Sequence, residues 1–201
     1  MKSRDILFDK VKEVLLKKNY PFYIGEMNLN FVGIRTSNTK ADNFDDFFCL
    51  LWKEKGEKRF WICDEFTTDP GLYYLQKKLL NPKGCAIMVP SHYKSLWTIG
   101  LHGNHNPYRA FVQIGKVKVY RDRDKDEVLD LDPATIQESA YLGINLHHGF
   151  DSKLVGPNSA GCQVFKHDKD LNFLLTLADK SSKFYGKKFS YSLLEEKDFT
   201  V

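Results

Sequence analysis

Apolar and polar positions follow two different periods along this chain, and the first period is helical. Over residues 4–18, apolar side chains recur every three or four positions, which predicts an amphipathic helix with one face packed on the rest of the protein. Ser3 stands where a side chain can cap this helix, and Asn19-Tyr20-Pro21 ends it. The apolar stripe consists of Ile6, Leu7, Val11, Val14 and Leu15.

A different period governs the middle of the chain, where short apolar runs rich in aromatic and β-branched residues predict strands. Residues 55–58 predict a hairpin between two of these runs, and residues 67–71, Thr-Thr-Asp-Pro-Gly, predict a tight turn. Residues 141–147 alternate in polarity and predict a strand that ends at a pair of histidines, whereas residues 169–183 return to helical spacing. The other predicted strands are residues 28–35, 46–53, 59–64, 85–89, 96–100, 110–113, 117–121 and 189–193.

These elements predict a single domain that is mainly β, of the β-rich α+β class, with a helix near each end. The domain spans residues 1–201, with an N-terminal helix within residues 1–20 and a β-rich core over residues 28–195. The aromatic content agrees, because 15 Phe, 10 Tyr and 3 Trp favour sheets over a helical bundle.

The charge balance narrows the range of partners. The chain has 30 Lys and Arg against 26 Asp and Glu, a formal net charge of +4, which suits a polyanionic surface but is too weak to indicate nucleic-acid binding. No stretch approaches the roughly 20 apolar residues of a transmembrane helix. The charged first residues are not followed by an apolar run, so we expect no signal peptide and a soluble protein that is cytoplasmic as synthesised.

We expect no zinc ribbon among the four cysteines, because none of them stands in a C-x-x-C pair. Cys49, Cys63 and Cys85 lie in apolar stretches, which predicts buried thiols. Residues 122–130 carry acidic residues at every second position, as calcium loops do, but Glu127 stands where such a loop has glycine. We therefore expect a solvated hairpin turn there, and neither a metal nor a cofactor in the protein.

The fourth cysteine lies in a different setting, the run Ser159-Ala160-Gly161-Cys162. A thiol needs a neighbouring base to act as a nucleophile at neutral pH, and His147 lies fifteen residues upstream at the end of a predicted strand. The glycine-containing segment between them can fold back and bring the two side chains together. Gly161 lets the main chain approach a substrate, so its amide and that of Cys162 are expected to stabilise an oxyanion.

A strand that ends in histidine, a glycine-containing loop and then Ser-x-Gly-Cys resembles the signature of the L,D-transpeptidase (YkuD-like) catalytic domain family. Runs similar to residues 29–35, 67–71, 117–122 and 143–147 occur in a divergent phage and bacterial branch of that family, so the resemblance covers most of residues 28–178.

Two positions depart from the pattern of the main family. Ala160 stands where it often has His or Lys, and Val164 stands where it usually has Arg or Asn. Alignment on Gly-Ile-Asn-x-His favours His147 as the base, whereas alignment on His-Gly favours His148, and adjacent strand residues face opposite sides.

The resemblance implies an L,D-transpeptidase-like β-sandwich or barrel with a helix after the catalytic cysteine. It also implies a cysteine transferase or peptidoglycan peptidase that cleaves or exchanges L,D-type bonds of stem peptides through a Cys162 acyl-enzyme. The protein would act on the cell wall after release or export by another route, as a phage endolysin does. The alternative is a non-catalytic module that binds wall peptides on the same fold.

Further site residues are expected around this pair. Ser159 or Asn145 would orient the histidine or the loop, and Asn145 and Gly149 would lie on the substrate side. Residues 101–109 form either a surface loop or a substrate-facing loop, and in the second case His102 and Arg109 would pair with a stem-peptide carboxylate.

Overall fold

The computed structural model describes residues 2 and 7–200, and strands make up most of its regular structure. Eight strands form a closed barrel in the order β1-β11-β5-β6-β9-β10-β3-β2, and three more form a separate sheet in the order β4-β7-β8. The predicted mainly β fold with a helix near each end is confirmed. The barrel strands are β1 (Asn30–Arg35), β2 (Asp46–Glu54), β3 (Glu57–Thr67), β5 (His92–His102), β6 (Tyr108–Gln113), β9 (Leu146–His148), β10 (Gln163–Phe165) and β11 (Phe189–Glu195).

The middle of each of the first two strands is apolar because both of its faces are buried. On β1 and β2, alternate residues such as Phe31 and Phe48 point into the barrel, where most of the large aromatic side chains gather. The residues between them, such as Val32 and Cys49, face outward and are covered by helix α1 (Phe8–Lys17). Continuous apolar runs are the expected pattern for strands covered on both sides.

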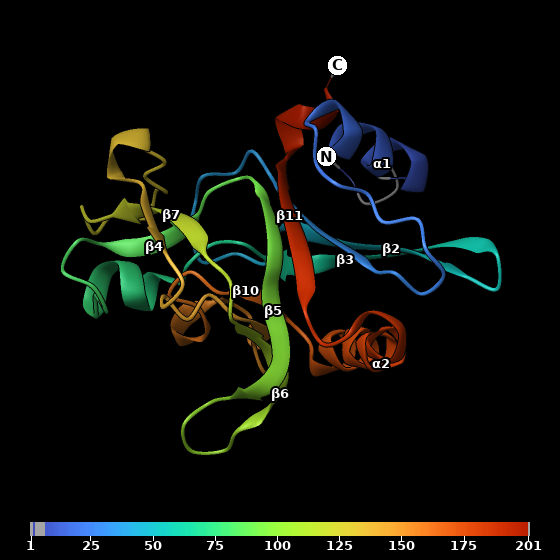
Figure 1. Cartoon of the computed structure of the whole chain (residues 1–201). Helices are drawn as coiled ribbons and strands as arrows, with labels where there is room; N and C mark the ends of the chain where they lie inside the picture. Colours follow the sequence, from blue (N-terminus) through green and yellow to red (C-terminus); the bar gives the residue numbers. More distant parts are fainter. Residues whose placement is uncertain (1, 3–6, 201) are drawn as a thin grey trace.

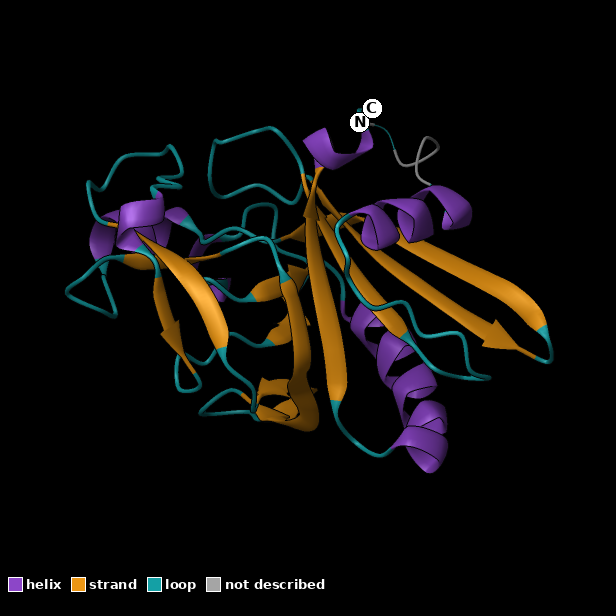
Figure 2. Ribbon diagram, turned by 45° about the horizontal axis from the view of Figure 1, so that its top comes forward, coloured by secondary structure: helices purple, strands orange, loops and turns teal. Residues whose placement is uncertain are grey.

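The separate sheet consists of β4 (Cys85–Met88), β7 (Val117–Asp122) and β8 (Gln137–Ser139), and in Figures 1 and 2 it lies on the opposite side of the barrel from α1 and α2. One of its faces contributes Ala86, Met88, Val117 and Val119 to the same core as the barrel. Its other face packs with Leu75, which lies in a short π-helix, η2 (Tyr73–Lys77). The crevice between this sheet and the barrel holds the candidate site.

Both predicted helices are present. Helix α1 ends near the expected position, while the predicted cap Ser3 lies outside the described residues; Leu7, expected in the apolar stripe, is exposed. Helix α2 (Asp168–Tyr185) directly follows β10 and lies along the barrel strands in Figure 2. It buries Leu174 and Ala178 in the barrel core. No helix in the described part of the chain is both long enough and apolar enough to cross a membrane. The short 3₁₀ helices are η3 (Pro133–Thr135), η4 (Gly156–Asn158) and η5 (Glu196–Phe199).

The region around the predicted histidine strand differs from expectation. Residues 141–145 are irregular, and only β9 remains of the predicted strand over 141–147. Tyr141 is 95% exposed and Gly143 has a positive φ of 70°, neither of which suits a half-buried strand. Strands β8 and β10 were not predicted, because three residues are too few to show an alternating pattern.

Candidate active site

The candidate site is built on two short parallel strands, β9 and β10. Val164 of β10 pairs with His147 of β9, and the N–H of Gln163 donates to the main-chain oxygen of Asn145 at 2.9 Å. Cys162, one residue before β10, therefore lies beside Asn145 rather than directly beside His147. Because alternate residues share a face, Asn145 and His147 present their side chains on the same side, toward Cys162.

The loop before Cys162 is held by Ser159, which is almost fully buried. Its hydroxyl donates to the main-chain oxygen of Cys162 at 3.0 Å and accepts from the N–H of Gly161 at 3.1 Å. Its own main-chain oxygen accepts from the N–H of Gly71, in the predicted Thr-Thr-Asp-Pro-Gly turn, at 2.9 Å. Ser159 thus fixes the loop, which is one of the two roles expected of it.

Gly161 fills a place that no other residue can take. Its φ is +120°, and a Cβ built on it would lie 2.5 Å from the main-chain oxygen of Ala86 in the second sheet. The expected oxyanion role of its amide is corrected, because that N–H already donates to Ser159. The N–H of Cys162, by contrast, donates to no other residue in the described part of the chain.

The Cys162 thiol is half-buried and protonated in this arrangement. Its Sγ donates to the main-chain oxygen of Gly143 at 3.3 Å. Burial raises the pKa of the Cys162 thiol to about 11, and a hydrogen bond from the main chain of Asn145 offsets part of that rise. The three other thiols are buried, as predicted.

His147 is 2% exposed, and its two ring nitrogens have different surroundings. Nδ1 lies 2.9 Å from the main-chain oxygen of His148 and 3.2 Å from the hydroxyl of Tyr108. A carbonyl oxygen only accepts, so we assign the proton to Nδ1, which leaves a lone pair on Nε2. Nε2 is buried without a well-formed hydrogen bond to the described residues, although the main chain of Asn158 lies close enough to favour the protonated ring.

Burial, together with the neighbouring His102, lowers the pKa of His147 to about 3, so its imidazole is neutral at neutral pH. The rings of His102 and His147 are stacked with centroids 4.1 Å apart. The side-chain amide of Asn145 donates to Nδ1 of His102 at 3.1 Å and accepts from the N–H of Gln113 at 2.9 Å. Asn145 therefore orients His102, which in turn packs on His147.

Cys162 and His147 line one pocket of about 390 Å³, which we call the Cys162 pocket. No hydrogen bond joins Sγ of Cys162 to the His147 ring among the described residues, because Sγ points to Gly143 instead. With a pKa of about 11 on the thiol and about 3 on the imidazole, the resting form is the neutral pair. The remaining lining residues are Tyr74, Leu80, Asn81, Gly84, Cys85, Ala86, His102, Arg121, Tyr141, Leu142, Gly143, Ile144, Pro157, Asn158 and Ala160.

Three residues expected near the substrate lie elsewhere. His148 points away from the pocket and packs between Tyr108 and Phe150, with ring centroids 4.4 Å from each. Gly149 is buried, and a Cβ there would lie 2.9 Å from the ring of Phe44. Arg109 is exposed on another face of the barrel, where it forms an ion pair of 2.8 Å with Asp179 of helix α2.

Two residues of the site were not predicted. Tyr108, which contacts Nδ1 of His147, lies at the start of β6 in a segment expected to be a loop. Arg121 continues the inward face of β7 after Val117 and Val119, and its side chain reaches the pocket wall. The alternation of residues 117–121 was the signal for that face. Val164, where the resembling family has a polar residue, is fully buried, with its side chain near Gly149 rather than in the barrel core.

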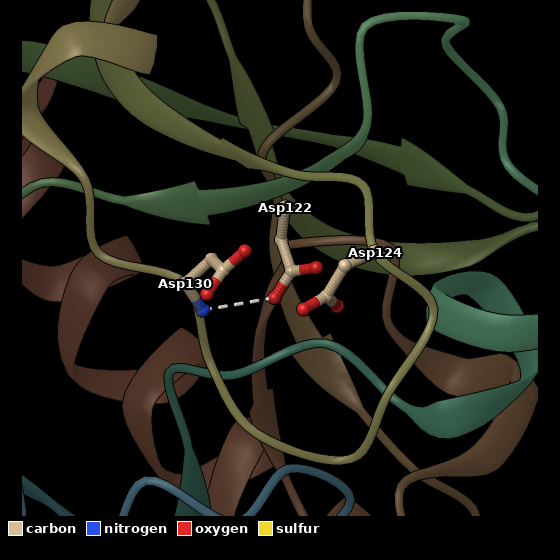
Figure 3. A group of neighbouring side chains, drawn as sticks. All are labelled: Asp122, Asp124 and Asp130. Atoms are coloured by element: carbon tan, nitrogen blue, oxygen red, sulfur yellow. Dashed lines mark hydrogen bonds between the residues drawn. The ribbon is translucent and has the colours of Figure 1, made fainter.

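The acidic loop after β7 gathers three carboxylates, those of Asp122, Asp124 and Asp130, whose oxygens lie within 4.8 Å of one another (Figure 3). The carboxylate of Asp122 accepts from the N–H of Asp130 at 3.0 Å, and that of Asp124 accepts from the N–H of Asp126 at 3.1 Å. Burial raises the pKa of Asp122 to about 6. These hydrogen bonds close the turn that connects β7 to β8, at the far side of β7 from the pocket face.

Comparison of the chain with protein-family models, with curated proteins and with solved structures gives no match. The L,D-transpeptidase assignment therefore stays a prediction from the motif.

Proposed function

We propose that the protein is a peptidoglycan-directed cysteine acyl-transfer enzyme that cleaves or exchanges L,D-type peptide bonds of stem peptides through a Cys162 acyl-enzyme. The observation that carries this proposal is the Cys162 pocket itself. It places a half-buried thiol and the neutral imidazole of His147 on the walls of one cavity, with Nε2 of that imidazole buried beneath its surface. A base must be neutral to accept a proton, and burial keeps His147 neutral, but the same burial makes it a weak base in the resting protein.

In the first half-reaction, the thiol proton passes to Nε2 of His147 while Sγ forms a bond to the carbonyl carbon after an L-centre, such as that of meso-diaminopimelate. Sγ must first rotate away from the main-chain oxygen of Gly143. The carbonyl electrons move onto oxygen, where the unused N–H of Cys162 is the available donor. The C–N bond then breaks, and Nε2–H gives its proton to the leaving amine. The buried imidazolium is a strong acid, which favours this donation.

In the second half-reaction, an amine or water attacks the thioester carbonyl and loses a proton to Nε2 of His147. The C–S bond breaks and the sulfur recovers the proton from Nε2–H. An amine acceptor gives transpeptidation, and water gives hydrolysis of the lytic type.

The alternative function is a module that binds wall peptides on the same fold without cleaving them. The high pKa of the Cys162 thiol and the missing hydrogen bond between Cys162 and His147 favour it over a permanently activated pair. The two functions differ in whether substrate binding brings thiol and imidazole together.

The test is incubation of the purified protein with defined muropeptides, a monomeric tetrapeptide and a cross-linked dimer, followed by mass spectrometry of the products. Loss of the terminal D-Ala, a new cross-linked dimer or a split dimer identifies the reaction. We expect Cys162→Ala to abolish every product, with Cys63→Ala as the control because that thiol lies outside the pocket. Unchanged products with Cys162→Ala, or tight binding without any product, would exclude the enzyme.

A further inference from the structure

Arg121 lies in the wall of the Cys162 pocket without an acidic partner. It is 7% exposed, and its Nε and one terminal nitrogen donate to neutral oxygens, Oε1 of Gln137 at 3.0 Å and the main-chain oxygen of Gly84 at 3.1 Å. Its second terminal nitrogen, Nη2, is buried without a partner, and the guanidinium forms no ion pair with any Asp or Glu in the described part of the chain.

A buried charge without a counter-charge destabilises a protein unless another group compensates it. Burial lowers the pKa of Arg121, yet a guanidinium stays protonated at neutral pH. The surroundings hold it in place: Gly84 has a φ of +122°, and a Cβ there would lie 2.3 Å from the main-chain oxygen of Asp122. This close approach of the main chain presents the Gly84 carbonyl to Arg121 and leaves Nη2 as the unused donor.

The register of the second sheet places Arg121 next to the Cys162 loop. Arg121 pairs with Ala86 across β7 and β4, and Gly161 packs against Ala86. Arg121 and Cys162 both line the pocket, and no Asp or Glu lines it. Among its lining residues Arg121 is the one with a permanent charge, so the pocket is electrostatically suited to an anionic ligand.

We infer that Arg121 binds a carboxylate of the acyl-donor peptide and so sets the substrate preference of the Cys162 pocket. A guanidinium with an unpaired terminal N–H forms short, charge-assisted hydrogen bonds to a carboxylate, and Arg121 lines the same cavity of about 390 Å³ as the thiol. This inference rests on the proposed function. It also moves the expected carboxylate contact from Arg109, which lies outside the pocket, to Arg121.

A stem peptide offers two such carboxylates, the one at its C-terminus and the one on the side chain of a diamino acid. The test therefore uses a tetrapeptide with both carboxylates free and two forms in which one or the other is amidated. We expect the wild-type kcat/KM to fall about 10- to 100-fold for one of the amidated forms, the loss typical of a charged hydrogen bond. With Arg121→Gln we expect the free and amidated forms to be turned over at nearly equal, low rates.

Arg109→Gln is the matched control, since it removes an arginine whose ion pair is exposed, and it should leave the preference intact. Arg121→Lys keeps the charge and should retain part of the preference. If Arg121→Gln lowers all three substrates by the same factor, or the wild-type enzyme does not distinguish them, the inference is wrong.

Binding of the same three peptides to Cys162→Ala and to Cys162→Ala/Arg121→Gln separates this inference from the proposed function. If Cys162→Ala binds one amidated form more weakly than the free peptide, and Cys162→Ala/Arg121→Gln binds both equally, the Arg121 subsite is supported even where no turnover occurs. Turnover that depends on Cys162 without a carboxylate preference supports the enzyme and overturns the subsite.

Discussion

Two buried polar regions connect the barrel to the second sheet, and they differ in how completely their polar atoms are paired. The first, which we call the Arg35 network, consists of Arg35, Asp46, Thr68 and Asp69. All three guanidinium nitrogens of Arg35 donate to acceptors 2.8–3.2 Å away, and Nε lies 3.2 Å from the carboxylate of Asp69. The second is the Cys162 pocket, where Nε2 of His147 and Nη2 of Arg121 have no partner among the described residues.

This difference distinguishes polar groups that stabilise the fold from polar groups that serve a function. In the Arg35 network, Arg35 donates to the main-chain oxygen of Met88 in β4, and this hydrogen bond fixes the second sheet against the barrel. In the Cys162 pocket, unpaired buried atoms raise the free energy of the empty protein and are available to a substrate. Removing a group should therefore lower stability in the network and lower activity in the pocket.

The largest effect is expected at the histidine pair. His147→Asn should lower kcat by about 10²–10⁴-fold because it removes the general base, as such catalysis contributes that much. His148→Asn is the matched control, since its ring packs on Tyr108 and Phe150 outside the pocket, and kcat should change far less. Steady-state kinetics on a muropeptide measures both, and equal losses would remove the distinction between the two histidines.

The next effect compares the two buried arginines. Arg35→Met should lower the free energy of unfolding by about 3–5 kcal/mol, because it removes three buried hydrogen bonds and the cation beside Asp69, whose pKa burial and the neighbouring Asp46 raise to about 8. Arg121→Met should cost less, about 1 kcal/mol, because removing an uncompensated charge offsets the two lost hydrogen bonds. Urea denaturation measures both variants. A greater loss of stability in Arg121→Met than in Arg35→Met would show that Arg121 stabilises the fold rather than binding a substrate.

The thiol gives a smaller, pH-dependent effect. Burial raises the pKa of Cys162 to about 11, from about 9 for an ordinary thiol. Its thiolate fraction at neutral pH should therefore be about 100-fold lower than that of an exposed cysteine, and iodoacetamide should alkylate it about 100-fold more slowly. The rate should rise with pH up to about 11. Mass spectrometry of the modified protein follows the rate, with Cys162→Ala as the unlabelled control. Fast alkylation of the free protein at pH 7 would contradict the neutral resting pair.

The smallest effect is expected at Ser159. Ser159→Ala leaves the N–H of Gly161 without its acceptor and should lower the free energy of unfolding by about 1–3 kcal/mol. Ser182→Ala is the control, because that hydroxyl only donates to a carbonyl already inside helix α2, and its loss should be near zero. Thermal unfolding compares the two, and a neutral Ser159→Ala would mean that the Cys162 loop is held by other contacts.

The fold was largely predictable because its signals are local. Helical spacing and alternating runs separated by turns gave both helices and most strands, including the hairpin of β2 and β3. The pairing of β9 with β10 was not predictable in this way. Each strand has three residues, and their parallel alignment depends on contacts between distant segments such as Gly71 and Ser159.

The candidate site was predictable in part. The Ser-x-Gly-Cys run and the upstream histidine pointed to Cys162 and His147, which the structure places in one pocket. Arg121 was not predictable, although alternation assigned its face of β7, because only the packing of the second sheet on the barrel turns that face toward the pocket. The position of Arg109 was predicted wrongly for the same reason, because the sequence of a loop and a strand does not determine which side of the barrel an arginine side chain faces.

The proposed reaction requires that Cys162 form a covalent bond to the acyl part of a stem peptide. Rapid mixing of the protein with a tetrapeptide, quenching in acid and measurement of the intact mass test it most directly. We expect a transient adduct with the mass of the acyl fragment, mapped to the peptide that contains Cys162, that accumulates less in His147→Asn and is absent in Cys162→Ala. Product formation without any adduct on Cys162, or an adduct that persists in Cys162→Ala, would contradict the account.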